Sequence, residues 1–280
     1  MSTKLAGVIG YPVAHSLSPR LHGFWLKESG IDGAFVPLAA RREDFSQIVN
    51  SLGKLGFAGV SVTVPHKEAA FAICHDLDEP ARIAGAVNLL VFKGARLEGR
   101  NTDASGLAAS LVEQLGKDAL KAKHAVLLGA GGAARACVLA LAGLGVKRIS
   151  ILNRDAARAE ALARALEGKV SSQLVPAMLS DWGKLAGDAA LAINATAAGT
   201  SGAPSLDIAL DALPKSAAVC DIVYSPLETP LLKQAHAKGR KTIDGLGMLM
   251  HQAVPAFAAF YGATPKVTPA LRAELEKALS

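Results

Sequence analysis

The stretch VLLGAGGAARACVLALAGLG, residues 126–145, decides the fold. It begins at the end of an apolar strand, passes through closely spaced glycines and continues into a helix rich in Ala and Leu that closes at Gly145. Gly129 permits a tight turn, Gly131 lets the backbone approach a pyrophosphate, and Ala134 is small enough for close contact between helix and strand. Because free N–H groups at such a helix start attract phosphates, the stretch predicts a dinucleotide-binding βαβ unit.

The strand that follows carries the evidence on which dinucleotide binds. It ends in NRDAAR, residues 153–158, whereas NAD sites usually place a carboxylate at this strand end to bind the ribose 2′-hydroxyl. Asn153 stands there instead, and the guanidiniums of Arg154 and Arg158 fit a 2′-phosphate. The alternative is that both arginines are surface residues, although a helix start disfavours cations. The carboxylate of Asp155 would repel the phosphate, but two cations against one anion leave the site net positive. NADP is therefore predicted, with NAD as the weaker alternative.

The composition is that of a globular protein with a large core. Hydrophobic residues make up 51% of the 280 residues and aromatic residues only 5%, which suits helices packed on a parallel sheet. The net charge of +6 comes without a dense basic tract, and therefore favours small anionic ligands over nucleic acid. The three cysteines match no metal spacing and indicate reduced thiols in a cytoplasmic protein. We expect no signal peptide and no membrane span.

Short apolar stretches alternate with helical patterns along almost the whole chain. Strands are expected at residues 5–10, 34–39, 59–65, 86–92, 125–130, 149–153, 191–196, 217–224 and 241–245. Such alternation is typical of parallel sheets built from βαβ units. A hairpin is expected to turn at Gly94, and the polar stretch 116–124 separates the two series of strands. The tail from Met248 is expected to be helical.

The stretch GVSVTVPHKEAA, residues 59–70, raises a question about one lysine. Its valines alternate with polar residues, as expected of a strand with a buried face, and Pro65 ends the strand. Lys67 follows at once, either as a solvated residue in the first turn of a helix or as a working group in a crevice. Position alone favours the solvated lysine, because exposed lysines are the commonest kind.

Seven stretches together resemble the shikimate dehydrogenase family, in the same order and over nearly the whole chain. They are GYPVAHSLSPRLH (10–22), VTVPHK (62–67), GAVNLLVFKGARLEGRNTDASG (85–106), GAGGAAR (129–135), NATAAGT (194–200), DIVYSPLETPLL (221–232) and DGLGMLMHQA (244–253). The resemblance implies an oxidoreductase of aromatic amino-acid biosynthesis that interconverts shikimate and 3-dehydroshikimate by hydride transfer with NADP(H). It also implies two α/β domains with a cleft between them, the second a doubly wound Rossmann-type domain.

The resemblance assigns domains and site residues. The substrate domain would be residues 1–104, with helices 248–280 folding back onto it, and the NADP domain residues 105–247. Lys67 and Asp103 match the catalytic pair. Substrate-binding positions fall on Ser16, Ser18, Thr63, Asn88, Tyr224 and Gln252, of which the two serines hold the substrate carboxylate. Cofactor-binding positions fall on Gly129, Ala130, Gly131, Gly132, Ala133, Asn153, Arg154, Arg158, Thr196 and Gly245.

Two of these residues have a structural alternative. Ser18 precedes Pro19 and an apolar helix, which is an N-cap pattern, and Asp103 stands where it would cap the helix that follows it. A lysine and an aspartate at one hydroxyl suit proton transfer coupled to hydride transfer, and the sequence does not decide which of the two carries the proton.

The chain also departs from the family pattern. Ser61 stands where Asn is expected, Leu89 where Thr is expected, and Ala104 where Gly is expected, all at the border of the substrate pocket. These departures leave open a quinate/shikimate dehydrogenase with broader substrate or NAD use. A non-catalytic relative that senses such ligands is disfavoured, because it has no need of both Lys67 and Asp103. A monomer and a homodimer both fit the sequence.

Overall fold

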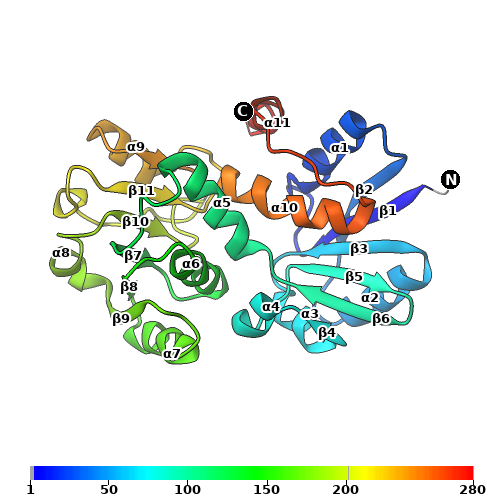
Figure 1. Ribbon diagram of the computed structural model, residues 1–280, viewed down its shortest axis with the longest axis horizontal. Coiled ribbons are helices and arrows are strands. Elements are labelled where there is room, and N and C mark those ends of the chain that lie inside the picture. Colours follow the sequence, from blue (N-terminus) through cyan, green and yellow to red (C-terminus); the bar gives the residue numbers. More distant parts are fainter. Residues whose placement is uncertain (1–2, 201, 280) are drawn as a thin grey trace. The chain divides into compact units, whose positions relative to one another are not determined.

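The computed structural model describes residues 3–200 and 202–279, which divide into two compact units (Figure 1). The first unit consists of two segments of the chain, one that ends at Thr102 and one that begins at Gln252, and the second unit runs from Asp103 to His251. The polar stretch 116–124, which the sequence sets between the two series of strands, lies inside the second unit as turns that follow helix α5 (Asp103–Leu115).

The first unit is built on a six-stranded sheet with the order β2-β1-β3-β5-β6-β4. Its strands are β1 (Lys4–Gly10), β2 (Gly33–Ala39), β3 (Phe57–Val62), β4 (Asp76–Leu77), β5 (Leu89–Lys93) and β6 (Arg96–Arg100). β1 pairs in parallel with β2 and β3, but β5 runs antiparallel to both β3 and β6. The expectation of a parallel sheet is therefore wrong for this part, because β5 pairs antiparallel with the distant strand β3, while the expected hairpin at Gly94 (φ +61°) pairs β6 with β5.

The strand expected at residues 59–65 is shorter in the structure. β3 ends at Val62, and Val60 and Val62 are both buried, whereas Val64 is 69% exposed. After β1 ends at Gly10, the N–H of Tyr11 still donates to the carbonyl of Val64 at 3.0 Å, but Pro65 has no N–H with which to extend the ladder. The alternation of the valines thus ends at Val62.

Helices cover both faces of this sheet. One face packs on α2 (Phe45–Lys54) and α3 (Lys67–Ile73) through an apolar cluster that includes Val49, Val60 and Leu90. The other face carries an aromatic cluster of His22, Trp25, Phe35, Phe257, Phe260 and Tyr261. Its helices are α1 (Ser18–Ser29), the part of α10 (Gly245–Tyr261) from Gln252 on, and α11 (Pro269–Glu276). The short helix α4 (Glu79–Ala84) precedes β5.

The second unit is a doubly wound parallel sheet with the order β12-β11-β10-β7-β8-β9. Its strands are β7 (His124–Leu128), β8 (Arg148–Asn153), β9 (Gln173–Met178), β10 (Leu191–Asn194), β11 (Ala218–Asp221) and β12 (Thr242–Ile243). Its other helices are α6 (Gly132–Gly143), α7 (Ala156–Leu166), α8 (Trp182–Leu185) and α9 (Pro230–Ala237), with short 3₁₀ turns at Leu179–Asp181 and Leu210–Ala212. This arrangement confirms the predicted Rossmann-type fold.

Two strands of this sheet, β9 and β11, show the largest differences from the prediction. β9 was not expected, because Pro176 lies inside it, and a proline is tolerated there since β9 is at the edge of the sheet. β11 ends at Asp221 rather than at Tyr224, so the last residues of the predicted strand form a loop. That loop carries one of the predicted substrate-binding residues.

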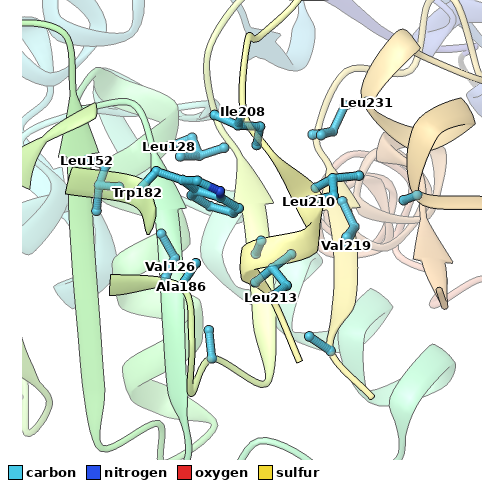
Figure 2. Close-up of a cluster of buried hydrophobic side chains, with 14 of the residues drawn as sticks. Val126, Leu128, Leu152, Trp182, Ala186, Ile208, Leu210, Leu213, Val219 and Leu231 are labelled. Carbon is cyan, nitrogen blue, oxygen red and sulfur yellow. The ribbon is translucent and has the colours of Figure 1, made fainter. Parts of the chain in front are cut away.

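The core of the second unit surrounds one tryptophan (Figure 2). Trp182 belongs to one apolar cluster with Val126 and Leu128 of β7 and Val219 of β11, and its indole N–H donates a hydrogen bond to the carbonyl of Ala209 at 2.9 Å. The core therefore fixes the central strands whose carboxyl ends carry the site described next. In residues 3–200 and 202–279, no helix combines the length and apolar character that a membrane span requires.

Candidate functional site

A cavity of about 600 Å³ opens at the carboxyl ends of β7, β8 and β10. The cofactor residues predicted from the sequence that line it are Gly129, Ala130, Gly131, Asn153, Arg154, Arg158 and Thr196. The sequence did not single out Leu128, Leu152, Leu179, Ala195, Ala197, Ala198 and residues 203–207, which complete the lining. The cavity lies where open α/β sheets bind their ligands.

The turn between β7 and α6 is shaped for a phosphate. Gly129 has φ +112°, and a Cβ there would lie 2.9 Å from the methyl of Thr196, so the turn requires glycine. Gly131 is the N-cap residue of α6 and provides no side-chain cap for the N–H groups of the first turn. A Cβ at Gly131 or Gly132 would meet no atom within 4 Å, so the space over the helix start is open. These features fit the pyrophosphate of a dinucleotide.

Asp155, which complicated the choice between NADP and NAD, has a structural role. Its Oδ1 accepts a hydrogen bond from the N–H of Ala157 at 3.0 Å and thereby caps α7. The amide of Asn153 donates to the backbone carbonyl of Asp155 at 3.0 Å. Arg154 and Arg158 line the cavity, whereas Asp155 is not among its lining residues. The carboxylate is therefore held at the helix end.

Three predicted cofactor residues lie off the cavity lining. Gly132 and Ala133 belong to the first turn of α6. Gly245 begins α10, where a Cβ would overlap the carbonyl of Ile222. A close approach between two backbone segments explains that glycine without a contact to a ligand.

The polar residues of the first unit gather at one edge of its sheet. β1, β3 and β6 end at this edge, and the antiparallel β5 begins there. The ends of β1, β3 and β6 are followed by Ser16, Lys67 and Thr102, respectively, and Asn88 directly precedes β5. Strand direction alone therefore collects residues that are far apart in the sequence. A Cβ at Gly10 would overlap the methyl group of Thr63, which shows how closely β1 and the end of β3 approach.

The two serines lie at the start of α1. The helix begins at Ser18, with Leu17 as its N-cap residue, and no side chain caps it. The capping alternative for Ser18 is therefore wrong, because the helix starts one residue earlier than that pattern requires. The N–H of Ser18 donates to Oγ of Ser16 at 3.3 Å, so the two serines are neighbours at a helix start, as an anion site requires.

Asn88 and Gln252 meet around a threonine that the sequence analysis did not select. The amide nitrogen of Asn88 donates to Oε1 of Gln252 at 3.1 Å and to the hydroxyl oxygen of Thr102 at 2.9 Å. The N–H of Thr102 donates to Oδ1 of Asn88 at 2.8 Å, and its hydroxyl donates to the carbonyl of Gln252 at 2.9 Å. The signal for Thr102 was its place in the NTD motif, beside Asp103.

Lys67 is half-buried as the first residue of α3. Its carbonyl accepts a hydrogen bond from Val87 N–H at 2.9 Å. The preceding His66 is 1% exposed, its Nε2 lies 2.8 Å from the carbonyl oxygen of Ala40, and its ring stacks on Phe45 with centroids 4.5 Å apart. The backbone that carries the lysine is thus fixed on both sides.

The other two predicted residues belong to the second unit. Asp103 begins α5, directly after Thr102, and is 8% exposed. Tyr224 lies in the loop after β11, where burial raises the pKa of its hydroxyl. Among the residues that the structure describes, no group of His, Cys, Asp and Glu could hold a metal ion.

A Rossmann-type unit with a phosphate turn and two arginines, joined to a second α/β unit with a polar sheet edge, defines the class of NAD(P)-dependent oxidoreductases. Comparison with known families makes the assignment specific. The shikimate dehydrogenase substrate-binding domain matches residues 8–90, and the domain described as shikimate/quinate 5-dehydrogenase matches residues 110–202. The chain belongs to the shikimate dehydrogenase family, as its motifs predicted.

Full-length relatives agree. The chain is 51% identical to the shikimate dehydrogenase (NADP(+)) of Acidiphilium cryptum, over 96% of this chain and 94% of that protein. The solved shikimate 5-dehydrogenase of Thermus thermophilus, in complex with NADP(H) and shikimate, superposes with a TM-score of 0.85 at 35% identity, covering 99% of this chain and 98% of that one. A quinate dehydrogenase of Corynebacterium glutamicum, in complex with NAD, gives 0.87 at 30% identity, with 98% of each chain covered.

Proposed function

We propose that this chain interconverts shikimate and 3-dehydroshikimate with NADP(H). The observation that carries the proposal is the combination of Arg154 and Arg158 in the lining of the dinucleotide cavity with relatives of about half-identical sequence that are NADP-dependent shikimate dehydrogenases. Residues 105–247 would form the NADP domain, and residues 1–104 with 248–280 the substrate domain. NADP, when bound, accepts the hydride during oxidation.

The substrate-binding roles are those that the family resemblance assigns, and the positions described above support them. Ser16 and Ser18 would hold the substrate carboxylate at the start of α1, where the helix N–H groups add to the hydroxyls. Thr63, Asn88, Tyr224 and Gln252 would bind the ring hydroxyls. Support comes from the Asn88, Thr102 and Gln252 cluster, whose hydrogen bonds fix the orientation of both amides.

Lys67 and Asp103 would act on the hydroxyl that is oxidised. That oxygen must lose its proton as its carbon loses hydride, and in the reverse reaction the carbonyl oxygen must receive a proton. The lysine cation stabilises negative charge that develops on the oxygen, and the carboxylate provides a second group for the proton. The backbone of Lys67 is fixed by His66 and Val87, which supports a defined starting point for its side chain.

A direct assay tests the function. Purified protein is given shikimate or quinate with NADP or NAD, and the reduced nicotinamide is followed by its absorbance. We expect the highest kcat/KM for shikimate with NADP. Absence of shikimate oxidation with either cofactor would overturn the proposal.

Quinate is the second candidate substrate, on one specific observation. Ser61 and Leu89, the two departures from the family pattern in β3 and β5, are directly paired across the two strands, and Leu89 is fully buried. A small hydroxyl beside an apolar side chain changes the pocket border at one place. Quinate carries one more ring hydroxyl than shikimate, and a kcat/KM for quinate within tenfold of that for shikimate would favour the broader enzyme.

The setting of the enzyme is part of the proposal. We infer a cytoplasmic enzyme, monomeric or homodimeric, that binds neither nucleic acid nor membrane. Cys74, Cys137 and Cys220 are free, and burial raises the pKa of Cys137 to about 12, which keeps that thiol protonated and unreactive. Light scattering of the purified protein measures the oligomeric state.

A further inference from the structure

Two buried polar residues end neighbouring central strands of the second unit. Asn194 is the last residue of β10 and Asp221 the last of β11; they are paired in the sheet register, and both are fully buried. The amide nitrogen of Asn194 donates to Oδ1 of Asp221 at 3.0 Å. The proposed roles in binding and catalysis involve neither side chain.

Asn194 uses the rest of its side chain to shape the loop that lines the dinucleotide cavity. Its Oδ1 accepts hydrogen bonds from the N–H of Thr196 at 3.0 Å and from the Thr196 hydroxyl at 2.7 Å. Its nitrogen also donates to the carbonyl of Ala198 at 3.1 Å. The Thr196 hydroxyl in turn accepts from the N–H of Ala198 at 3.1 Å. All hydrogen-bonding positions of this amide are therefore used.

Asp221 holds a different loop. Its Oδ1 also accepts from the N–H of Val223 at 3.1 Å, and its Oδ2 accepts from the hydroxyl of Thr229 at 2.7 Å. Thr229 is fully buried and caps α9, since its oxygen accepts from the N–H of Leu232 at 3.3 Å. One carboxylate thus binds both ends of the loop formed by residues 222–229, and Tyr224 lies within this loop.

Hydrogen bonds compensate the burial of the Asp221 carboxylate. Burial raises the pKa of Asp221, while its three donors oppose that effect. A buried carboxylate is kept only where its hydrogen bonds compensate the lost hydration, and here every partner is a donor. The same two side chains therefore fix the cofactor loop on one side and the Tyr224 loop on the other.

We propose that Asn194 and Asp221 are positioning residues that couple the cofactor loop at residues 195–198 to the loop that carries Tyr224. This rests on the proposed function, which gives Thr196 and Tyr224 their ligands. A change at either residue should alter NADP binding and the KM for shikimate together, because one hydrogen-bonded pair anchors both loops.

Asn194→Asp provides the sharpest test. A protonated aspartic acid at position 194 has one O–H, which can keep the bond to Asp221 but not the bond to the Ala198 carbonyl. Two carboxylates in contact repel each other and raise the pKa of the pair. Cys220, whose thiol pKa is raised by burial and by the carboxylates of Asp221 and Asp244, stays neutral throughout. At about pH 6.5 the Kd for NADP, measured by titration calorimetry, should be within about threefold of the wild type, and by about pH 9 it should rise roughly tenfold relative to the wild type at that pH.

Two variants of Asp221 separate shape from charge. In Asp221→Asn the oxygen can face Asn194 and Val223 while the nitrogen donates to Thr229, so binding should stay within about threefold of the wild type. Asp221→Ala leaves the Asn194 amide and the Thr229 hydroxyl without this acceptor, so both the NADP Kd and the shikimate KM should rise by about tenfold or more. Circular dichroism confirms that each variant is folded.

Ser150→Ala is the matched control. Ser150 is fully buried in β8 of the same sheet and is bonded to Nε2 of His124 at 2.9 Å, near the opposite ends of the strands. Its loss should lower stability and leave the NADP Kd unchanged. The inference is overturned if folded Asp221→Ala keeps the wild-type Kd and KM, if only one of these two constants changes, or if Asn194→Asp shows no pH dependence beyond that of the wild type. A wild-type protein that binds NADP but does not oxidise shikimate instead refutes the proposed function and leaves the NADP arm of this test intact.

Discussion

His22 links the packing of the first unit to pH. The imidazole is 1% exposed and stacks on Phe35 with ring centroids 3.8 Å apart. Among the described residues, no group hydrogen-bonds to its Nδ1. Burial lowers the pKa of His22 from 6.5 to about 3, so the ring stays neutral in the folded protein down to strongly acidic pH.

The sign and size of the effect follow from that pKa. Below pH 6.5 the unfolded chain binds a proton at His22 and the folded chain does not, so stability is lost as the pH falls from 6.5 toward the folded pKa. pH 5 lies about 1.5 units below the pKa of 6.5 in the unfolded chain, so the lost free energy of unfolding is about 2 kcal/mol at 1.36 kcal/mol per unit. This is a large part of the stability of an ordinary domain.

The two tryptophans allow the first unit to be followed separately. Trp25 lies in the aromatic cluster, with its ring 6.0 Å from that of His22, and Trp182 lies in the second unit. In a Trp182→Phe background, urea unfolding followed by fluorescence therefore reports on the first unit. Between pH 7 and pH 5, we expect His22→Phe to remove about 2 kcal/mol of the loss in unfolding free energy. His236→Gln, at a histidine with a 78% exposed side chain, should leave the loss unchanged. An equal loss in His22→Phe and its parent would refute the reasoning.

The remaining predictions concern the proposed site. Lys67→Ala should reduce kcat about a hundredfold or more, with a much smaller change in KM, and Asp103→Asn should also reduce it; more than half the wild-type rate in either variant contradicts the assignment. Ser16→Ala should weaken the apparent affinity for shikimate by about 1–2 kcal/mol and leave the NADP Kd unchanged, whereas the reverse pattern would place the carboxylate site wrongly. The wild type should prefer NADP to NAD by about ten- to a thousandfold in kcat/KM, from two cations against one anion. Asp155→Asn keeps the cap of α7 but removes the charge, so it should widen the preference for NADP about two- to fivefold at low salt and less at high salt. Arg154→Ala should narrow the preference. A wild type that prefers NAD contradicts this account.

The sequence predicted the second unit better than the first for a physical reason. Strands buried on both faces of a parallel sheet are continuous apolar runs, and β7, β8 and β10 were visible as such. The edge strand β9 contains Pro176 and is only half-buried, so its pattern is weak. In the first unit, the direction of β5 depends on pairing partners that are distant in the sequence, and no local pattern encodes it.

The glycines and arginines of the cofactor site were visible because each reflects a local requirement. Gly129 needs a positive φ, and Arg154 and Arg158 stand beside one strand end. Thr102 and Asp221 were not selected, because a polar residue at a strand end acquires its meaning only from a partner on another strand. Asp155 is a different case, because the sequence set its charge against the phosphate, and the structure shows the carboxylate capping α7 through the N–H of Ala157.

Buried polar pairs at strand ends also explain how one fold can hold reacting groups in place while its pocket borders vary. The sheet fixes the backbone of a strand end, so an amide or carboxylate there loses little conformational entropy when it forms hydrogen bonds. Those hydrogen bonds then fix the conformation of the loop that follows. Asn88 does this for Thr102 and Gln252, and Asn194 does it for Thr196. Residues proposed only to border the substrate, such as Ser61, can change without moving these anchors. Changes of substrate preference are therefore expected at the borders, and losses of activity with every substrate at the anchors.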